Sequence, residues 1–216
     1  MGRLYGFFDC NRHHFRCVFQ RMGLDMKDRP ILFSADMVKA IIAGRKTQTR
    51  RLASSPLAKI KPGTKLWVRE RTLITAVKGS LIDVKYEADD TVGTNISWPE
   101  RLSGTPKVGS RLSMGCYREA SRVCLYVTDV REEPLNSLCH EDALAEGINF
   151  RFDEGRRGYS HEDPAAKGIA LHQDARTAFF SLWDSLHSKP GNTSIDDPRV
   201  VVIQFKRSNR NIDTRP

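Results

Sequence analysis

The apolar segments of this chain are short, and their order restricts the folds that it can form. Residues 65–69, 81–86 and 121–130 have the alternation and the β-branched content of strands, and 31–33 and 199–205 are short apolar runs of the same kind. Apolar residues at helical spacing follow the 31–33 run, and they recur in two further segments before the 199–205 run. A strand, a helix, several strands, two helices and a strand do not alternate as a doubly wound parallel sheet requires. The order predicts an α+β fold with a small β-barrel of about five or six strands, decorated by short helices and long loops.

The helices carry recognisable end signals. Ser34 is an N-cap residue before apolar positions at helical spacing, and Gly44 ends that helix. A short helix is expected over 140–146, with Cys139 in the position that Ser, Thr or Asp usually takes. A longer amphipathic helix is expected over 173–187, where Phe179 and Trp183 are interpreted as core residues.

The remaining segments are polar and are expected to be loops. Residues 45–51 form a basic loop, 87–112 a long loop and 149–170 a flexible insertion. We expect one folded domain over 29–207. Residues 1–28 are expected to be an N-terminal extension, which is either disordered or, over 1–25, upstream of a true start codon at Met26. Residues 208–216 are expected to be a basic tail.

Composition narrows the function classes. The chain has 35 Lys and Arg against 26 Asp and Glu, a net charge of +9, which permits polyanion binding but also suits an ordinary basic protein. No run approaches the roughly 18 apolar residues of a membrane helix. The five cysteines show no CxxC pair, and no phosphate-loop, dinucleotide or metal-ligand motif is present. We therefore expect a cytoplasmic protein without membrane association, metal or cofactor.

The segment from Gly44 to Arg51 is the main candidate for chemistry. It combines basic groups with hydroxyls and an amide, in the sequence Arg45, Lys46, Thr47, Gln48, Thr49, Arg50 and Arg51. Guanidinium groups suit bidentate phosphate contacts. A threonine beside a lysine could act as a nucleophile if burial removed the lysine's proton. A solvated basic loop is the simpler interpretation. Acids cluster on the 140–146 helix (Glu141, Asp142 and Glu146), either as solvated surface charge or, for Glu146 beside Gly147, pointing into a cleft.

Several motifs together resemble the ASCH domain family, in particular its phage and prophage members. They are GRKTQTRR, PGTKLWVRE, ASRVCLYVTDV, EDALAEGI, the Phe-Phe-x-Leu-Trp helix and VVVIQFKR, and they extend from about Arg29 to Arg207. ASCH domains are relatives of the PUA RNA-binding barrel, so the resemblance implies a small barrel with a cleft that binds RNA or a nucleobase. Some small members hydrolyse the amide of N4-acetylcytidine, and others have been proposed to be ribonucleases. By resemblance, Thr49 is the nucleophile, Lys46 its activator and Glu146 a proton shuttle or substrate anchor.

The nucleic-acid contacts expected in such a cleft involve basic and aromatic groups. They are assigned to Arg45, Arg50, Arg51, Arg69, Trp67 and Tyr117. The chain departs from the family in two ways: it is about twice as long as the small amidohydrolases, and Gly115–Glu119 replaces a His-Met-Pro-Arg-Trp-like run. Three functions stay open: a module that binds RNA or a modified nucleoside, a hydrolase acting on one, and a phage accessory protein that binds a host protein.

Overall fold

The computed structural model describes residues 27–102, 104–112, 115–153, 155–162, 170–208 and 212–213. The expected extension therefore lies outside the described residues, apart from Lys27 and Asp28. Of the expected tail, only Ser208, Ile212 and Asp213 are described.

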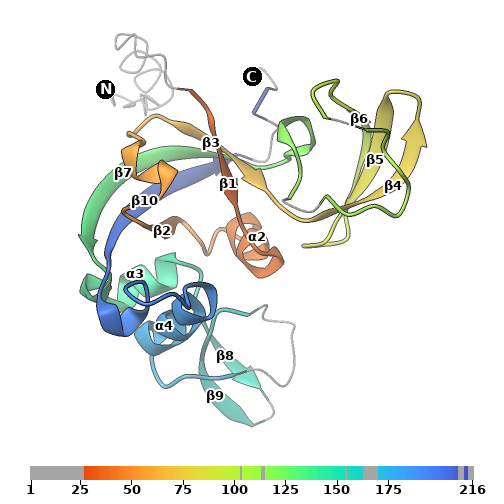
Figure 1. Ribbon diagram of the computed structural model, residues 1–216. Helices are drawn as coiled ribbons and strands as arrows, with labels where there is room; N and C mark the ends of the chain where they lie inside the picture. The colour runs from red at the N-terminus through yellow and green to blue at the C-terminus, as the bar shows by residue number, and fades with distance from the viewer. Residues whose placement is uncertain are drawn as a thin grey trace, which may run out of the picture.

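A curved five-stranded sheet forms the centre of the molecule (Figure 1). Its order is β1 (Arg29–Leu32), β3 (Lys65–Arg69), β7 (Cys124–Pro134), β10 (Arg199–Ser208) and β2 (Gln48–Leu52). The β1–β3 pair is parallel and the others are antiparallel. Within the described residues β1 and β2 are edge strands with no ladder between them, so the α+β class is confirmed while the sheet is open rather than a closed barrel.

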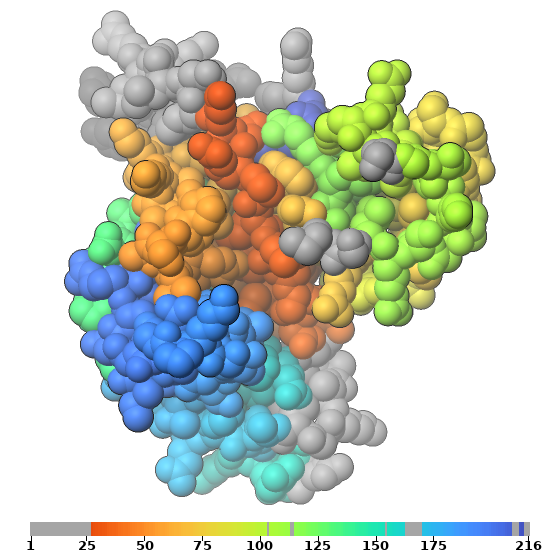
Figure 2. All heavy atoms as spheres, in the orientation of Figure 1, coloured from red at the N-terminus to blue at the C-terminus, as the bar shows by residue number. Residues whose placement is uncertain are grey.

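A separate three-stranded meander stands to one side of this sheet (Figures 1 and 2). It consists of β4 (Thr72–Lys78), β5 (Leu81–Tyr86) and β6 (Val92–Ser97). The expectation of a continuous loop over 87–112 was wrong for β6. Its polar residues are compatible with a strand because its backbone pairs with β5 and only Ile96 packs against the core of this sheet.

Two of the three helices begin directly after the capping residues that the sequence indicated, and the third begins at Ala175 within the expected 173–187 range. α2 (Ala35–Ile42) begins after Ser34, whose Oγ accepts a hydrogen bond from the Met37 amide at 3.4 Å. α3 (His140–Ala145) begins after Cys139, whose Sγ accepts from the Asp142 amide at 3.4 Å. α4 (Ala175–Leu186) is the longest described helix, with 12 residues, and a membrane crossing needs about 20. No helix in the described ranges is therefore long and apolar enough to span a membrane.

The segment after α3 contains a β-hairpin instead of the expected flexible insertion. Its strands are β8 (Asn149–Asp153) and β9 (Arg156–Ser160), joined at Gly155 with φ +79°. Four short 3₁₀ turns complete the described structure: η1 (Pro56–Lys59), η2 (Arg118–Ala120), η3 (Leu135–Ser137) and η4 (Ser194–Asp196).

Strand β10 is buried on both faces, which explains its continuous apolar run. Val201 and Ile203 belong to a core between the sheet and α2. Val200 and Val202 belong to a second core that includes Phe179 and Trp183 of α4, as the helical stripe predicted. The central sheet therefore has α2 on one face and α3 with α4 on the other, and the candidate site lies where these layers meet.

Candidate functional site

Most of the basic segment is an edge strand, β2, with Gln48, Thr49 and Arg50 buried, and not the exposed loop that its composition predicted. β2 pairs with β10, with Thr49 opposite Ile203. Alternate side chains point to opposite faces: Arg50 lies 6.0 Å from the Phe179 ring centroid, and Arg51 lies 5.2 Å from that of Phe33. The segment can be buried because carboxylates from distant elements neutralise its charges.

Lys46 and Glu146 are in direct contact, although 100 residues separate them in the chain. The Lys46 ammonium donates to Glu146 Oε2 at 2.8 Å and to the Glu146 carbonyl at 2.7 Å. Both residues are buried, with exposed fractions of 2% and 4%. Gly147 permits this approach: its φ is +100°, and a Cβ there would meet the Lys46 Cβ at 3.3 Å. The structure thus brings together two of the three residues that the resemblance grouped.

The environment of Lys46 weakens its hold on a proton. Burial lowers the pKa of the Lys46 ammonium, because desolvation disfavours the charged form. The Glu146 carboxylate acts in the opposite direction, while the positive charges of Arg51 and Arg50 lower the Lys46 pKa further. The net result is a lysine pKa below its ordinary value, as a lysine base requires.

Arg50 is the centre of a buried ionic network. Its guanidinium donates to Glu146 Oε1 at 3.2 Å, Glu133 Oε1 at 2.6 Å and Asp142 Oδ2 at 2.7 Å. Its side chain has no exposed surface, so Arg50 offers nothing to a phosphate. This corrects its assignment to nucleic-acid binding: Arg50 holds β2 against α3 and β7.

Asp142 is held in its charged form by this network. Burial alone would raise the pKa of the Asp142 carboxyl, but hydrogen bonds from Arg50 and Gln48 and the charge of Arg131 keep that pKa below its ordinary value. No sequence pattern singled out Arg131 or Glu133. Their positions on β7 face the network only because β7 and β2 flank β10.

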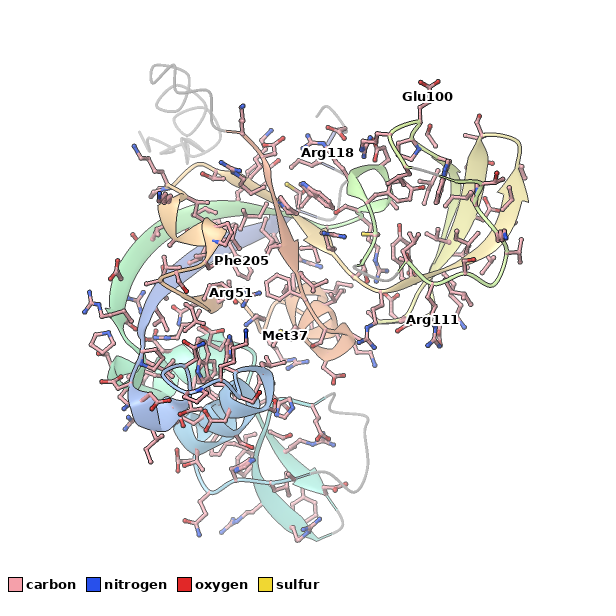
Figure 3. The ribbon with its side chains drawn as sticks, viewed as in Figure 1. Met37, Arg51, Glu100, Arg111, Arg118 and Phe205 are labelled. Atoms are coloured by element: carbon pink, nitrogen blue, oxygen red, sulfur yellow. The ribbon has the colours of Figure 1, made fainter. Side chains whose placement is uncertain are left out.

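Thr49 belongs to a neighbouring but different cluster. Its hydroxyl oxygen is buried and accepts a hydrogen bond from Arg51 Nη1 at 2.8 Å. Arg51 Nη2 donates to the Leu32 carbonyl at 3.0 Å, so this side chain bridges the two edges of the open sheet near the centre of the fold (Figure 3). Within the described part of the chain no hydrogen bond joins Thr49 to Lys46.

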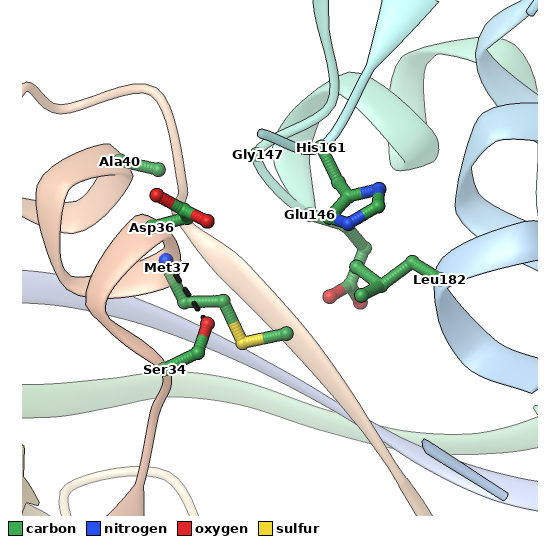
Figure 4. Close-up of a pocket in the computed structure, with 8 residues that line it drawn as sticks. All are labelled: Ser34, Asp36, Met37, Ala40, Glu146, Gly147, His161 and Leu182. Atoms are coloured by element: carbon green, nitrogen blue, oxygen red, sulfur yellow. Dashed lines mark hydrogen bonds between the residues drawn. The ribbon is translucent and has the colours of Figure 1, made fainter. Parts of the chain in front are cut away.

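A small cavity borders Glu146 (Figure 4). Its enclosed volume is about 10 Å³, and its lining comes from four segments: Ser34, Asp36, Met37, Ala40, Glu146, Gly147, His161 and Leu182. Arg45 lies next to this lining and donates from Nη1 to the Gly147 carbonyl at 3.3 Å. The lining therefore combines two carboxylates, an imidazole and an apolar wall, with a guanidinium next to it.

His161 is a lining residue that sequence reasoning missed. Burial lowers the pKa of its imidazole, and within the described residues its buried Nδ1 has no hydrogen-bond partner. The scattered positions of the histidines in the chain gave no signal for it. Across the described ranges, no group of three or more His, Cys, Asp or Glu is arranged to hold a metal ion.

Two of the remaining expected contact residues pack elsewhere. Tyr117 is 8% exposed and lies in the core of the three-stranded sheet, edge-to-face with Trp98 at 5.7 Å. It is therefore a packing residue and not a stacking surface. Arg69 lies over the half-buried Trp67 ring at 5.8 Å and donates to the Cys116 carbonyl at 3.3 Å.

Comparison with known proteins yields little. No family model and no curated protein matches the chain. A crystal structure of an Enterococcus faecalis protein described by the family model DUF984 aligns with 92% of this chain and 90% of its own, at a TM-score of 0.42 and 11% identity. This degree of similarity assigns neither a fold family nor a function.

Proposed function

We propose that the protein binds a modified nucleobase in the cavity beside Glu146 and hydrolyses an amide on that base. The observation that carries this proposal is the buried contact between Lys46 and Glu146, whose carboxylate borders the cavity. A buried ionisable pair next to a cavity, with a lysine pKa lowered by desolvation, is the arrangement expected of acid–base chemistry.

The cavity is nearly closed in this conformation. Its enclosed volume of about 10 Å³ is close to that of one water molecule, so a base can enter only if the lining side chains move apart. A planar base could pack against Met37 and Leu182, and its N–H groups could donate to the Glu146 carboxylate. The ribose would then remain towards solvent, where Arg45 is available to an attached phosphate.

The proposed reaction assigns one role to each residue. Once the substrate has opened the site, Thr49 Oγ attacks the amide carbonyl and its proton passes to the neutral form of Lys46, which the lowered pKa makes accessible, while Arg51 stabilises the negative charge that develops on the oxygen. The proton returns to the departing amine through Glu146, and water then releases the acyl group from Thr49. Since Thr49 is buried and bonded to Arg51, the substrate must displace part of the apolar wall to reach it.

The test is turnover of N4-acetylcytidine by purified protein. We expect acetate release by the wild type, no release by Thr49→Ala, and normal release by Thr47→Ala, the exposed threonine two residues away. Glu146→Gln should lower kcat by about 10²-fold or more, as expected when a proton-transfer group is removed. Full activity in Thr49→Ala would exclude this residue as the nucleophile, and an inactive wild type would reject this substrate.

A binding module without chemistry is the second candidate. The position of Arg45 beside the cavity favours it, because a guanidinium there could contact the phosphate of a bound nucleotide. In that case a nucleoside monophosphate should protect the protein against thermal unfolding, and Arg45→Gln should remove the additional effect of the phosphate. Equal protection by the nucleoside and its monophosphate would argue against Arg45 as a phosphate contact.

A further inference from the structure

The β8–β9 hairpin projects beyond α4 at the lower end of the molecule as drawn (Figure 1). Its register places Phe150 opposite Tyr159 and Phe152 opposite Arg157. Directly opposed residues share one face of a sheet, and so do alternate residues along a strand. Three aromatic rings and a guanidinium therefore form one face, which we call the aromatic face.

The outer part of the aromatic face is open to solvent. Phe152 is 71% exposed and Phe150 is 58% exposed. Phe150 meets the Tyr159 ring edge-to-face at 5.2 Å, and Tyr159 in turn meets the His140 ring of α3 at 5.4 Å. Rings this exposed are unusual for a monomer surface and indicate an interaction site.

The opposite face of the hairpin is packed, which fixes the aromatic face in place. Arg151, Asp153, Gly158 and Ser160 are buried there. Gly158 lies so close to the 171–172 segment that a Cβ would meet the His172 carbonyl oxygen at 2.7 Å. Tyr159 and His172 exchange two backbone hydrogen bonds, at 2.8 and 2.9 Å. The rings are thus held before any ligand binds, which reduces the entropic cost of binding.

The chemistry of the aromatic face selects its ligand. The hairpin sequence contains no Leu, Ile, Val or Met, the aliphatic residues that a hydrophobic protein interface would use. Every large group on this face is planar, and the charged side chains that the structure describes as exposed on the hairpin, Arg156 and Arg157, are both positive. Planar rings beside arginine suit the bases and phosphates of an unpaired nucleic-acid strand.

We propose that the aromatic face binds single-stranded nucleic acid, with successive bases stacked on Phe150 and Phe152 and a phosphate on Arg157. The hairpin begins two residues after Gly147 and ends directly before His161, and both residues line the cavity. Both ends of the hairpin therefore adjoin the lining of the cavity. The link to the cavity rests on the proposed function, whereas binding to the hairpin stands without any hydrolysis.

The test is fluorescence anisotropy with a labelled single-stranded RNA of about ten nucleotides, within the usual range of single-strand sites. The double variant Phe150→Ser/Phe152→Ser should bind at least about 10-fold more weakly, because each stacked base contributes substantially to affinity. Phe152→Trp should bind at least as tightly as the wild type. Ile195→Ser, which alters a residue 90% exposed in η4, is the matched control and should bind normally.

Charge and strand state provide two further readouts. Arg157→Gln should reduce the slope of log affinity against log salt by about one unit, since one phosphate contact is lost. A duplex of the same sequence should bind more weakly, because its bases are already stacked.

Wild-type affinity in the double serine variant would overturn the proposal, and so would the absence of strand binding by the wild type. Dimers of the wild type that dissociate in the double variant, without strand binding, would identify the aromatic face as a contact between copies of the chain. The assay measures no turnover, so an inactive cavity would not affect its result.

Discussion

At the residue scale, Arg50 shows what burial of a cation requires. Three carboxylates meet its guanidinium, and its side chain has no exposed surface. Removing one member of a buried ion pair leaves the opposite charge unpaired in the protein interior, which solvates charge poorly. The loss in free energy of unfolding is about 3–5 kcal/mol. An exposed ion pair contributes about 0–1 kcal/mol.

We therefore expect Arg50→Met to lower the free energy of unfolding by about 3–5 kcal/mol in urea titrations. The control is Arg199→Met, which breaks an exposed pair with Glu132 at 3.1 Å and should change stability by less than about 1 kcal/mol. Equal losses in the two variants would contradict the role assigned to Arg50.

Lys46 should make stability depend on pH in the alkaline range. Burial lowers its pKa in the folded chain below the ordinary 10.5. Between these two pKa values the unfolded chain binds more protons, so the contribution of Lys46 to the free energy of unfolding rises with pH. The free energy of unfolding is expected to increase with pH in this way whenever folding disfavours the charged form of a lysine.

The measurement is urea unfolding of the wild type and Lys46→Met at several pH values from 7 to about 10, the range set by the lysine pKa. The difference in unfolding free energy, wild type minus variant, should increase with pH. A difference that stays constant or falls would show that the folded pKa of Lys46 is not lowered.

At the element scale, α3 carries Asp142 and ends at Glu146, so its start and end set the geometry of the site. Its N-cap is Cys139, and sulfur is a weak acceptor compared with a hydroxyl oxygen. Cys139→Ser should raise the free energy of unfolding by about 0.5–1 kcal/mol, and Cys139→Ala should not. The check is the urea midpoint of the three proteins at constant m-value, and identical midpoints for Ser and Ala would mean that the cap bond contributes nothing.

At the scale of the whole molecule, Arg122 joins the two sheets. It contacts the buried Glu70 carboxylate through two bonds of 2.8 Å, pairs with Asp89 at 2.9 Å and lies over the Tyr86 ring at 4.1 Å. Glu70 stands between β3 of the central sheet and β4 of the meander. The central sheet and the meander are therefore held together by ion pairs as well as by the chain that connects them.

Arg122→Met should accelerate amide hydrogen exchange throughout β4–β6 while leaving β7 and β10 protected. The reason is that the buried Glu70 carboxylate, 1% exposed, would lose its guanidinium partner. The meander would then lose its ionic attachment to the central sheet and open more often. Uniform acceleration across both sheets would mean that they unfold as one unit.

Local sequence signals predicted part of the secondary structure. Alternation placed the strands at 65–69 and 81–86 with the observed bounds, and Ser34, Cys139 and Gly44 marked helix ends, because these signals depend only on neighbouring residues. The pairing of Lys46 with Glu146 followed from resemblance and not from spacing, and its catalytic role remains a prediction.

Only the tertiary structure decided where the charged segments lie. Composition predicted an exposed loop at 45–51, yet Arg50 is buried because Glu133, Asp142 and Glu146, 83–96 residues away in sequence, neutralise it. The hairpin at 149–160 was not predicted, because its packed face is stabilised by contacts with the 171–172 segment and not by a local sequence pattern. Charge pairing and backbone pairing over such separations leave no local periodicity, so they become visible only once the chain has folded.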